Sequence, residues 1–148
     1  MARVATAQTP SIPSIAELLT RAEKVGAIAR ERAPEFEKAR QVSSDLVELM
    51  RELELFRVMQ PKRFGGFEYG YDVFVEAVSR VASGDGSTGW VYSLGAVHPW
   101  MIACYPEEAQ HDFWRDSYDT VAAVSYAPAG KAAPAPGGYR LSGRWSFA

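Results

Sequence analysis

The feature that most constrains this chain is a long stretch without charge. Residues Ser87–Cys104 contain no Asp, Glu, Lys or Arg, although the segments on both sides are charged. A helix of this length that is apolar all round is typical of a helix buried on every side. We therefore expect this segment to be a central helix, and to need more covering protein than short neighbouring helices provide.

The first predicted helix begins with a complete start signal. Ser14 and Glu17 have the spacing of a capping box, in which each side chain satisfies a backbone N–H of the other. Apolar residues then recur at helical spacing and form one face: Ile15, Leu18, Leu19, Ala22, Val25 and Ile28. Pro34 is predicted to end or kink this helix, followed by a charged turn over residues 35–40.

Three further helices are predicted from local signals. Ser44 is expected to cap the second helix, and a glycine-rich loop over residues 60–70 follows it. Asp72 is expected to cap the third helix, with Gly84 as its C-cap. Pro106 opens the last helix. The two glutamates that follow it interact favourably with the positive end of the helix dipole.

After Tyr118 the pattern changes from helical to alternating. Thr120–Tyr126 and Tyr139–Ala148 are predicted strands, and Pro128–Gly138 is a predicted loop. The expected fold class is therefore mainly α: a disordered tail over residues 1–13, a helical domain over residues 14–118, and the start of a β-domain over residues 119–148. Two strands are marginal alone, and their aromatic residues have nothing obvious to pack on.

The composition argues against several function classes. Hydrophobic residues make up 47% of the chain, charged residues 23%, and the net charge is −2. This balance predicts no basic face for nucleic acid and no polybasic membrane anchor. No apolar segment has the length needed to cross a bilayer. The single cysteine, Cys104, allows no internal disulfide and no cysteine-based metal site, so we expect a cytoplasmic protein without a bound metal.

Three segments together resemble the acyl-CoA dehydrogenase superfamily. Leu53–Gly66 (LELFRVMQPKRFGG) is similar to its first conserved turn, and Asp85–Trp90 (DGSTGW) to the start of its long buried helix. Gly138–Ala148 (GYRLSGRWSFA) is similar to the strand beside the flavin in its middle β-domain. The resemblance spans about Ser14 to Ala148, and it implies a helical N-terminal domain followed by the first strands of that β-domain. Members of the superfamily continue beyond these strands into a C-terminal helical bundle, so the resemblance also implies that the chain is a truncated piece of a longer protein.

Within the superfamily, two details resemble the oxygenase component of two-component aromatic hydroxylases. Ala123–Pro128 (AVSYAP) carries a serine where the phenol-hydroxylating enzymes similarly carry one, and Trp90 and His98 have the spacing of a pair around the aromatic substrate. The resemblance implies hydroxylation of a phenol with O₂ and reduced flavin, FMN or FAD. It also implies a separate flavin reductase as partner and a homo-oligomer, a tetramer in the full-length form.

The candidate site residues follow from the same resemblance. His98 could accept the proton of a phenol, whereas its residue type alone favours a core histidine bonded to a carbonyl freed by Pro99. Ser125 would bond to the substrate hydroxyl, and Trp90 would form part of the substrate pocket. The candidates for contact with the flavin are Tyr126, Trp145 and Ser146.

Two other functions remain open at this point. The first is an acyl-CoA dehydrogenase, which abstracts an α-proton and passes a hydride to FAD; its general base would lie in a C-terminal bundle. The second is a non-catalytic helical module that only binds partners.

Overall fold

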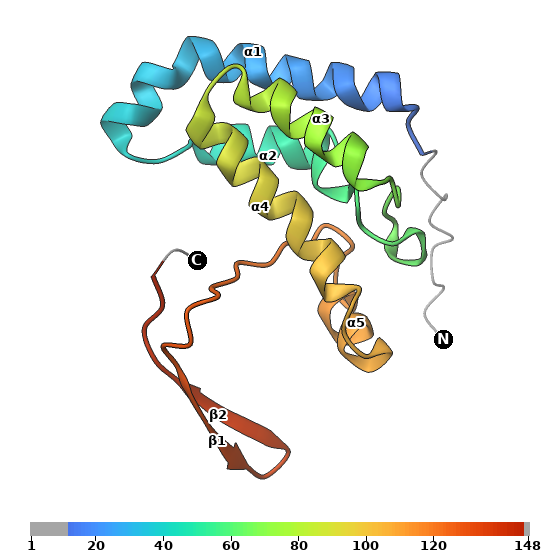
Figure 1. Cartoon of the computed structure of the whole chain (residues 1–148), viewed down its shortest axis with the longest axis vertical. Coiled ribbons are helices and arrows are strands. Elements are labelled where there is room, and N and C mark those ends of the chain that lie inside the picture. The colour runs from blue at the N-terminus through green and yellow to red at the C-terminus, as the bar shows by residue number, and fades with distance from the viewer. Residues whose placement is uncertain (1–11, 147–148) are drawn as a thin grey trace, which may run out of the picture.

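The computed structural model describes residues 12–146, and these residues form five helices followed by one hairpin (Figure 1). The elements are α1 (Ile15–Ala39), α2 (Ser44–Glu52), the 3₁₀ turns η1 (Leu55–Arg57) and η2 (Lys62–Phe64), α3 (Tyr71–Ala82), α4 (Gly86–Ile102), α5 (Glu107–Trp114), β1 (Lys131–Ala135) and β2 (Gly138–Ser142). The hairpin stands away from the helices. The predicted fold class, mainly α with the first strands of a β-domain, is confirmed. Most of the predicted tail and the last two residues of the second predicted strand lie outside the described residues.

Helix α1 begins as predicted but extends further. Ser14 and Glu17 form both hydrogen bonds of the capping box. The helix then continues through Pro34 to Ala39, so the predicted turn over residues 35–40 is wrong. Phe36 is only 4% exposed, and its burial favours the last turn of the helix despite the backbone hydrogen bond that proline removes.

Two predicted caps are displaced by a residue or more. Ser43, not Ser44, is the N-cap of α2, and Gly70, not Asp72, is the N-cap of α3. Asp72 lies in the first turn of α3, where its negative charge still interacts favourably with the positive end of the helix dipole. Such shifts are small, and both helices bury apolar residues, among them Leu46 and Met50 in α2 and Val73 and Ala77 in α3.

Gly84 has a different role from the predicted one. Ser83, in a right-handed conformation, is the C-cap of α3, and Gly84 does not adopt the left-handed conformation of a glycine C-cap. A Cβ atom on Gly84 would lie 1.8 Å from the carbonyl oxygen of Gly26 in α1. The absence of a side chain therefore allows the α3–α4 turn to lie directly against the backbone of α1.

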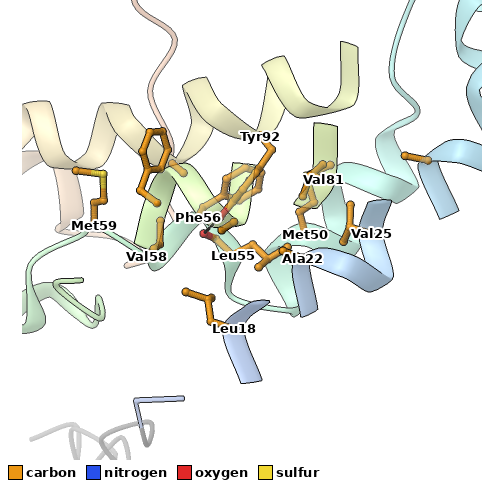
Figure 2. Packing of buried hydrophobic residues seen from close by; sticks show 14 of the residues in the cluster. Leu18, Ala22, Val25, Met50, Leu55, Phe56, Val58, Met59, Val81 and Tyr92 are labelled. Atoms are coloured by element: carbon orange, nitrogen blue, oxygen red, sulfur yellow. Dashed lines mark hydrogen bonds between the residues drawn. The ribbon is translucent and has the colours of Figure 1, made fainter. Parts of the chain in front are cut away.

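The core lies where α1, α3, α4 and η1 meet (Figure 2). The side chains that fill it come from every helix of the N-terminal part, and include Leu18, Ala22, Val25, Met50, Leu55, Phe56, Val81 and Tyr92. Tyr92 is fully buried, and its hydroxyl donates to the carbonyl oxygen of Leu55 at 3.3 Å. This burial raises the pKa of Tyr92, so the phenol stays neutral and fixes α4 on η1.

Helix α4 differs from the expected fully buried helix. Tyr92 and Ala96 are buried in the core against the other helices, and His98 is buried on a different side of the helix. Elsewhere on α4, Trp90 is 66% exposed and Trp100 is 47% exposed. The expectation of burial on every side is therefore wrong for this chain, which covers only part of the uncharged helix.

We expect this exposed face to make the chain self-associate. Two exposed tryptophans on an uncharged helix leave apolar surface in water, and association removes it. Sedimentation velocity over a concentration series should show a sedimentation coefficient that rises with concentration. A double variant, Trp90→Lys with Trp100→Lys, should remain monomeric over the same series. A wild-type chain that is monomeric at every concentration would contradict this prediction.

The β-strands lie at other positions than predicted. The predicted strand Thr120–Tyr126 is wrong, since these residues are not part of a sheet, and β1 falls inside the predicted loop. β1 pairs with β2 in antiparallel register, with Lys131 opposite Ser142, and β2 ends before Gly143. Pro134 is tolerated in β1 because a two-stranded hairpin leaves one edge of each strand unpaired.

Over the described residues, none of the helices has the length and apolar character of a membrane span.

Candidate active site

His98 is held by one ring nitrogen and has a second that is free to bind. The side chain lies in the C-terminal half of α4 and is 2% exposed. Its Nδ1 lies 2.6 Å from the carbonyl oxygen of Ala122. A carbonyl can only accept, so the proton lies on Nδ1 and, in the neutral ring, Nε2 is an acceptor. Nε2 is buried and has no hydrogen-bond partner among the described residues.

An unpartnered buried acceptor is unfavourable and needs a reason. Such a group costs about 1–3 kcal/mol, and most buried polar atoms in folded proteins have a partner. The partner carbonyl of His98 is not one freed by Pro99, as the core-histidine interpretation expected, but belongs to a distant segment. His98 therefore has the geometry of a group prepared to accept a hydrogen bond from a ligand.

The segment that holds His98 comes after α5 and forms neither a helix nor a strand. We call residues 117–126 the strap (Figure 1, between α5 and the hairpin). Besides the bond from His98 to Ala122, the hydroxyl of Tyr126 contacts the sulfur of Met101 at 3.0 Å. His98 and Met101 are three residues apart and share one face of the helix. The strap therefore runs along that face of α4.

The beginning of the strap is fixed to the turn that follows α2. Two guanidinium nitrogens of Arg57 donate to one carboxylate oxygen of Asp119, at 2.9 and 2.6 Å. The buried amide of Gln60 donates to the carbonyl oxygen of Tyr118 at 2.9 Å, and Arg51 donates to the carbonyl of Asp119. Arg51 of α2 and Arg57 and Gln60 after it therefore hold the strap through three side chains.

The far end of the strap meets the segment after the hairpin. The hydroxyl of Ser125 donates to the carbonyl oxygen of Ser146 at 3.1 Å. Trp145 is half-buried over Gly130 and Gly143, where added Cβ atoms would lie 2.1 and 2.9 Å from the indole ring. Tyr126 and Ser146 are exposed beside this junction, so four of the candidate residues gather on neighbouring segments.

Trp90 lies apart from this group. It lines a groove of about 730 Å³ between the end of α1 and the start of α4, together with Phe36, Val42 and Asp85. His98 is eight residues further along α4, which is about two helical turns. The structure therefore brings His98 close to the strap, and the strap to residues 145 and 146, but it does not bring Trp90 to them.

The sequence interpretation missed the residues that hold the strap. Arg57 and Gln60 lie in the Leu53–Gly66 motif, which the sequence identified only as a turn, and Asp119 is one of many surface-type acids. Ala122 acts through its backbone carbonyl, so its residue type gives no indication of this role. The described residues contain no cluster of three or more His, Cys, Asp or Glu side chains that could hold a metal ion.

Comparisons with a family model and with known proteins agree on one family. Residues 17–117 match the model of the acyl-CoA dehydrogenase N-terminal domain. The chain is 39% identical, over 80% of its length and 31% of the relative, to the oxygenase subunit HsaA of a flavin-dependent monooxygenase from Rhodococcus jostii (strain RHA1). It is also 39% identical, over 88% of its length and 32% of the relative, to the oxygenase component of the FADH(2)-dependent resorcinol hydroxylase of Rhizobium sp. (strain MTP-10005).

A solved structure agrees with these relatives. The crystal structure of 3-HSA hydroxylase from Rhodococcus sp. RHA1 superposes with a TM-score of 0.82 at 37% identity. The match covers 87% of this chain and 34% of that one. The chain thus spans about a third of the length of the proteins to which it is similar.

Proposed function

Because the chain belongs to the family of the acyl-CoA dehydrogenase N-terminal domain, we propose that it is the N-terminal part of the oxygenase component of a two-component flavin-dependent monooxygenase that hydroxylates a phenolic substrate. Relatives named as oxygenase components support this branch of the family. In this proposal residues 14–118 are the helical domain and residues 119–148 begin the β-domain. A separate reductase supplies the reduced flavin, and the full-length protein is a cytoplasmic homo-oligomer.

The observation that carries the proposal is the free Nε2 of His98. A phenol hydroxyl is a donor, and the buried imidazole of His98, whose Nδ1 donates to the carbonyl of Ala122, can accept that hydrogen bond at Nε2. Withdrawal of the phenol proton toward Nε2 raises the electron density of the phenol ring. This favours attack by an electrophilic oxygen at the ring carbon next to the hydroxyl. His98 would therefore act on the substrate.

Ser125 is proposed to act as a second contact for the substrate hydroxyl. Ser125 lies three residues along the strap from Ala122, whose carbonyl holds His98. Its hydroxyl hydrogen is used by Ser146, but its oxygen can still accept a bond. In this assignment a substrate would lie along the strap, between His98 and the junction with residue 146.

The residue types at that junction are suited to contacts with the ring of a flavin. Trp145 and Tyr126 offer aromatic faces, and Ser146 offers a hydroxyl for a polar edge of the ring. The Ser125–Ser146 bond brings this polar and aromatic group together from two segments. When bound, a reduced flavin supplies the electrons that activate O₂. The isoalloxazine ring is common to FMN and FAD, so the proposal includes both.

The direct test is transfer of oxygen from O₂ to a phenol. The longest open reading frame that contains these residues would be expressed and supplied with reduced FAD or FMN, ¹⁸O₂ and resorcinol. We expect a hydroxylated product with one ¹⁸O atom, and no product without reductant. If the protein instead oxidised an acyl-CoA with a dye as electron acceptor, it would be a dehydrogenase. If neither reaction occurred with a folded, flavin-binding protein, the proposal would be wrong.

A further inference from the structure

We propose that Arg57 and Asp119 are positioning residues for His98. Their ion pair holds the strap at the place where the carbonyl of Ala122 accepts the Nδ1 proton, and it thereby keeps Nε2 as an acceptor. The consequence for catalysis rests on the proposed function. The effect on the tautomer of His98 does not rest on the proposed function, and it can be measured separately.

The first step is the place of Asp119 along the strap. Asp119 is three residues before Ala122 and is the last charged side chain before it. Thr120 bonds back to Ser117 and so stays within the turn at the start of the strap. Because only Thr120 and Val121 separate Asp119 from Ala122, a shift of the chain at Asp119 is passed to the carbonyl of Ala122.

The second step is the geometry of the ion pair. Arg57 is 15% exposed and Asp119 is 38% exposed, so the pair is less screened by water than an ordinary surface pair. Nε and Nη2 of Arg57 both reach the same oxygen of Asp119, an arrangement that the planar guanidinium allows and a lysine ammonium does not. Arg57 is itself oriented by Glu54, at 3.1 Å, and Glu54 pairs with Arg21 of α1.

This chain of charges links the strap to the rigid part of the fold. It runs from α1 through the turn after α2 to Asp119, while His98 is held by the core packing of α4. The two partners of the His98–Ala122 bond are thus fixed by separate contacts. The strap side depends on the Arg57–Asp119 ion pair, together with the bonds of Gln60 and Arg51 to the backbone carbonyls of Tyr118 and Asp119.

The third step is what the Ala122 carbonyl does for the histidine. The partner of one ring nitrogen decides which nitrogen carries the proton. Without this carbonyl at 2.6 Å, the neutral ring can place its proton on Nε2. The ring would then present a donor where a phenol hydroxyl needs an acceptor. Loss of the ion pair should therefore mix the tautomers before it unfolds the protein.

The test is the ¹⁵N NMR spectrum of the imidazole rings in Asp119→Asn. The chain has two histidines, so a His111→Gln variant assigns the signals of His98. In the wild type we expect well-separated signals, from a protonated Nδ1 and an unprotonated Nε2. In Asp119→Asn we expect the two signals to move toward each other as the tautomers mix, and Asp119→Glu should restore part of the separation.

Asp45→Asn is the matched control. Asp45 also pairs with an arginine at 2.6 Å, but its partner is Arg32 of α1 and the pair is remote from the strap. The bond to Arg32 lowers the pKa of Asp45 to about 2, so this carboxylate is likewise stabilised in the folded protein. Asp45→Asn should leave the His98 signals unchanged. Unchanged signals in Asp119→Asn, or equal shifts in both variants, would overturn the proposal.

A kinetic measurement in the full-length protein separates this inference from the function. We expect Asp119→Asn to reduce product formed per reduced flavin by roughly tenfold, the lower end of what outer partners of a functional histidine contribute. If the tautomers mix as expected but hydroxylation is unchanged, the positioning is correct and the assigned role of His98 is wrong.

Discussion

Gly84→Ala is expected to lower the free energy of unfolding by about 3 kcal/mol or more. The new Cβ atom would lie 1.8 Å from the carbonyl oxygen of Gly26, 2.6 Å from its carbonyl carbon and 2.9 Å from its Cα. All three are backbone atoms, so no side chain can rotate away. The α3–α4 turn would have to leave α1, and the contact between α1 and α3 is the largest between any two helices. Urea unfolding followed by circular dichroism measures this change.

Gly86→Ala is the matched control for this prediction. Gly86 is two residues away, at the first position of α4, and a Cβ atom there would meet nothing within 4 Å. Alanine is the better helix former, so this variant should be unchanged or more stable by about 0.5–1 kcal/mol. Equal stability of the two alanine variants would show that the close contact between Gly84 and Gly26 does not limit the packing.

Gly84 also shows that local sequence patterns do not reveal a contact between distant segments. The sequence identified it as a special glycine next to the end of a helix, and this position is correct. The reason was wrong, because local patterns suggest a left-handed C-cap while the structure uses the missing side chain for contact with Gly26. A contact between residues 58 positions apart depends on how α1 packs on α3, and no local pattern encodes it.

The same distinction applies to the helices and strands. The capping box of Ser14 and Glu17 was predictable because all its atoms lie within one turn. The continuation of α1 past Pro34 was not, because it depends on the burial of Phe36 by other parts of the chain. Alternating residues over Thr120–Tyr126 predicted a strand, which the structure does not form. Whether such a chain joins a sheet or lies along a helix is decided by its neighbours.

For the candidate site, the sequence could predict side chains but not their backbone partners. His98 was identifiable because an imidazole in an uncharged helix is chemically unusual, and because the family resemblance assigns it a role. The carbonyl of Ala122 has no counterpart in the residue type. Arg57 and Asp119 are far apart in the sequence, and charged residues in surface loops are common, so only the fold shows that they meet.

The second large effect is expected for His98→Ala in the full-length protein. The change should reduce hydroxylation of a phenolic substrate by on the order of a hundredfold, the typical contribution of a positioned acid–base group. Consumption of O₂ by the reduced flavin should change little, because His98 is bonded to the middle of the strap whereas the proposed flavin contacts Trp145 and Ser146 lie beyond its end. Oxygen that is consumed without hydroxylation should appear as H₂O₂.

Stopped-flow absorbance of the flavin, with separate assays of product and H₂O₂, distinguishes these steps. His111→Ala is the control, since His111 is the other histidine, is 64% exposed and lies 3.5 Å from Glu107 on the surface of α5. It should leave the ratio of product to H₂O₂ at the wild-type value. His98→Ala also removes a buried side chain, so thermal unfolding must show that the variant remains folded at the assay temperature. If a folded His98→Ala variant still converted the same fraction of consumed O₂ into product, the free Nε2 would have no role in hydroxylation. The proposed function would then lose the observation that carries it.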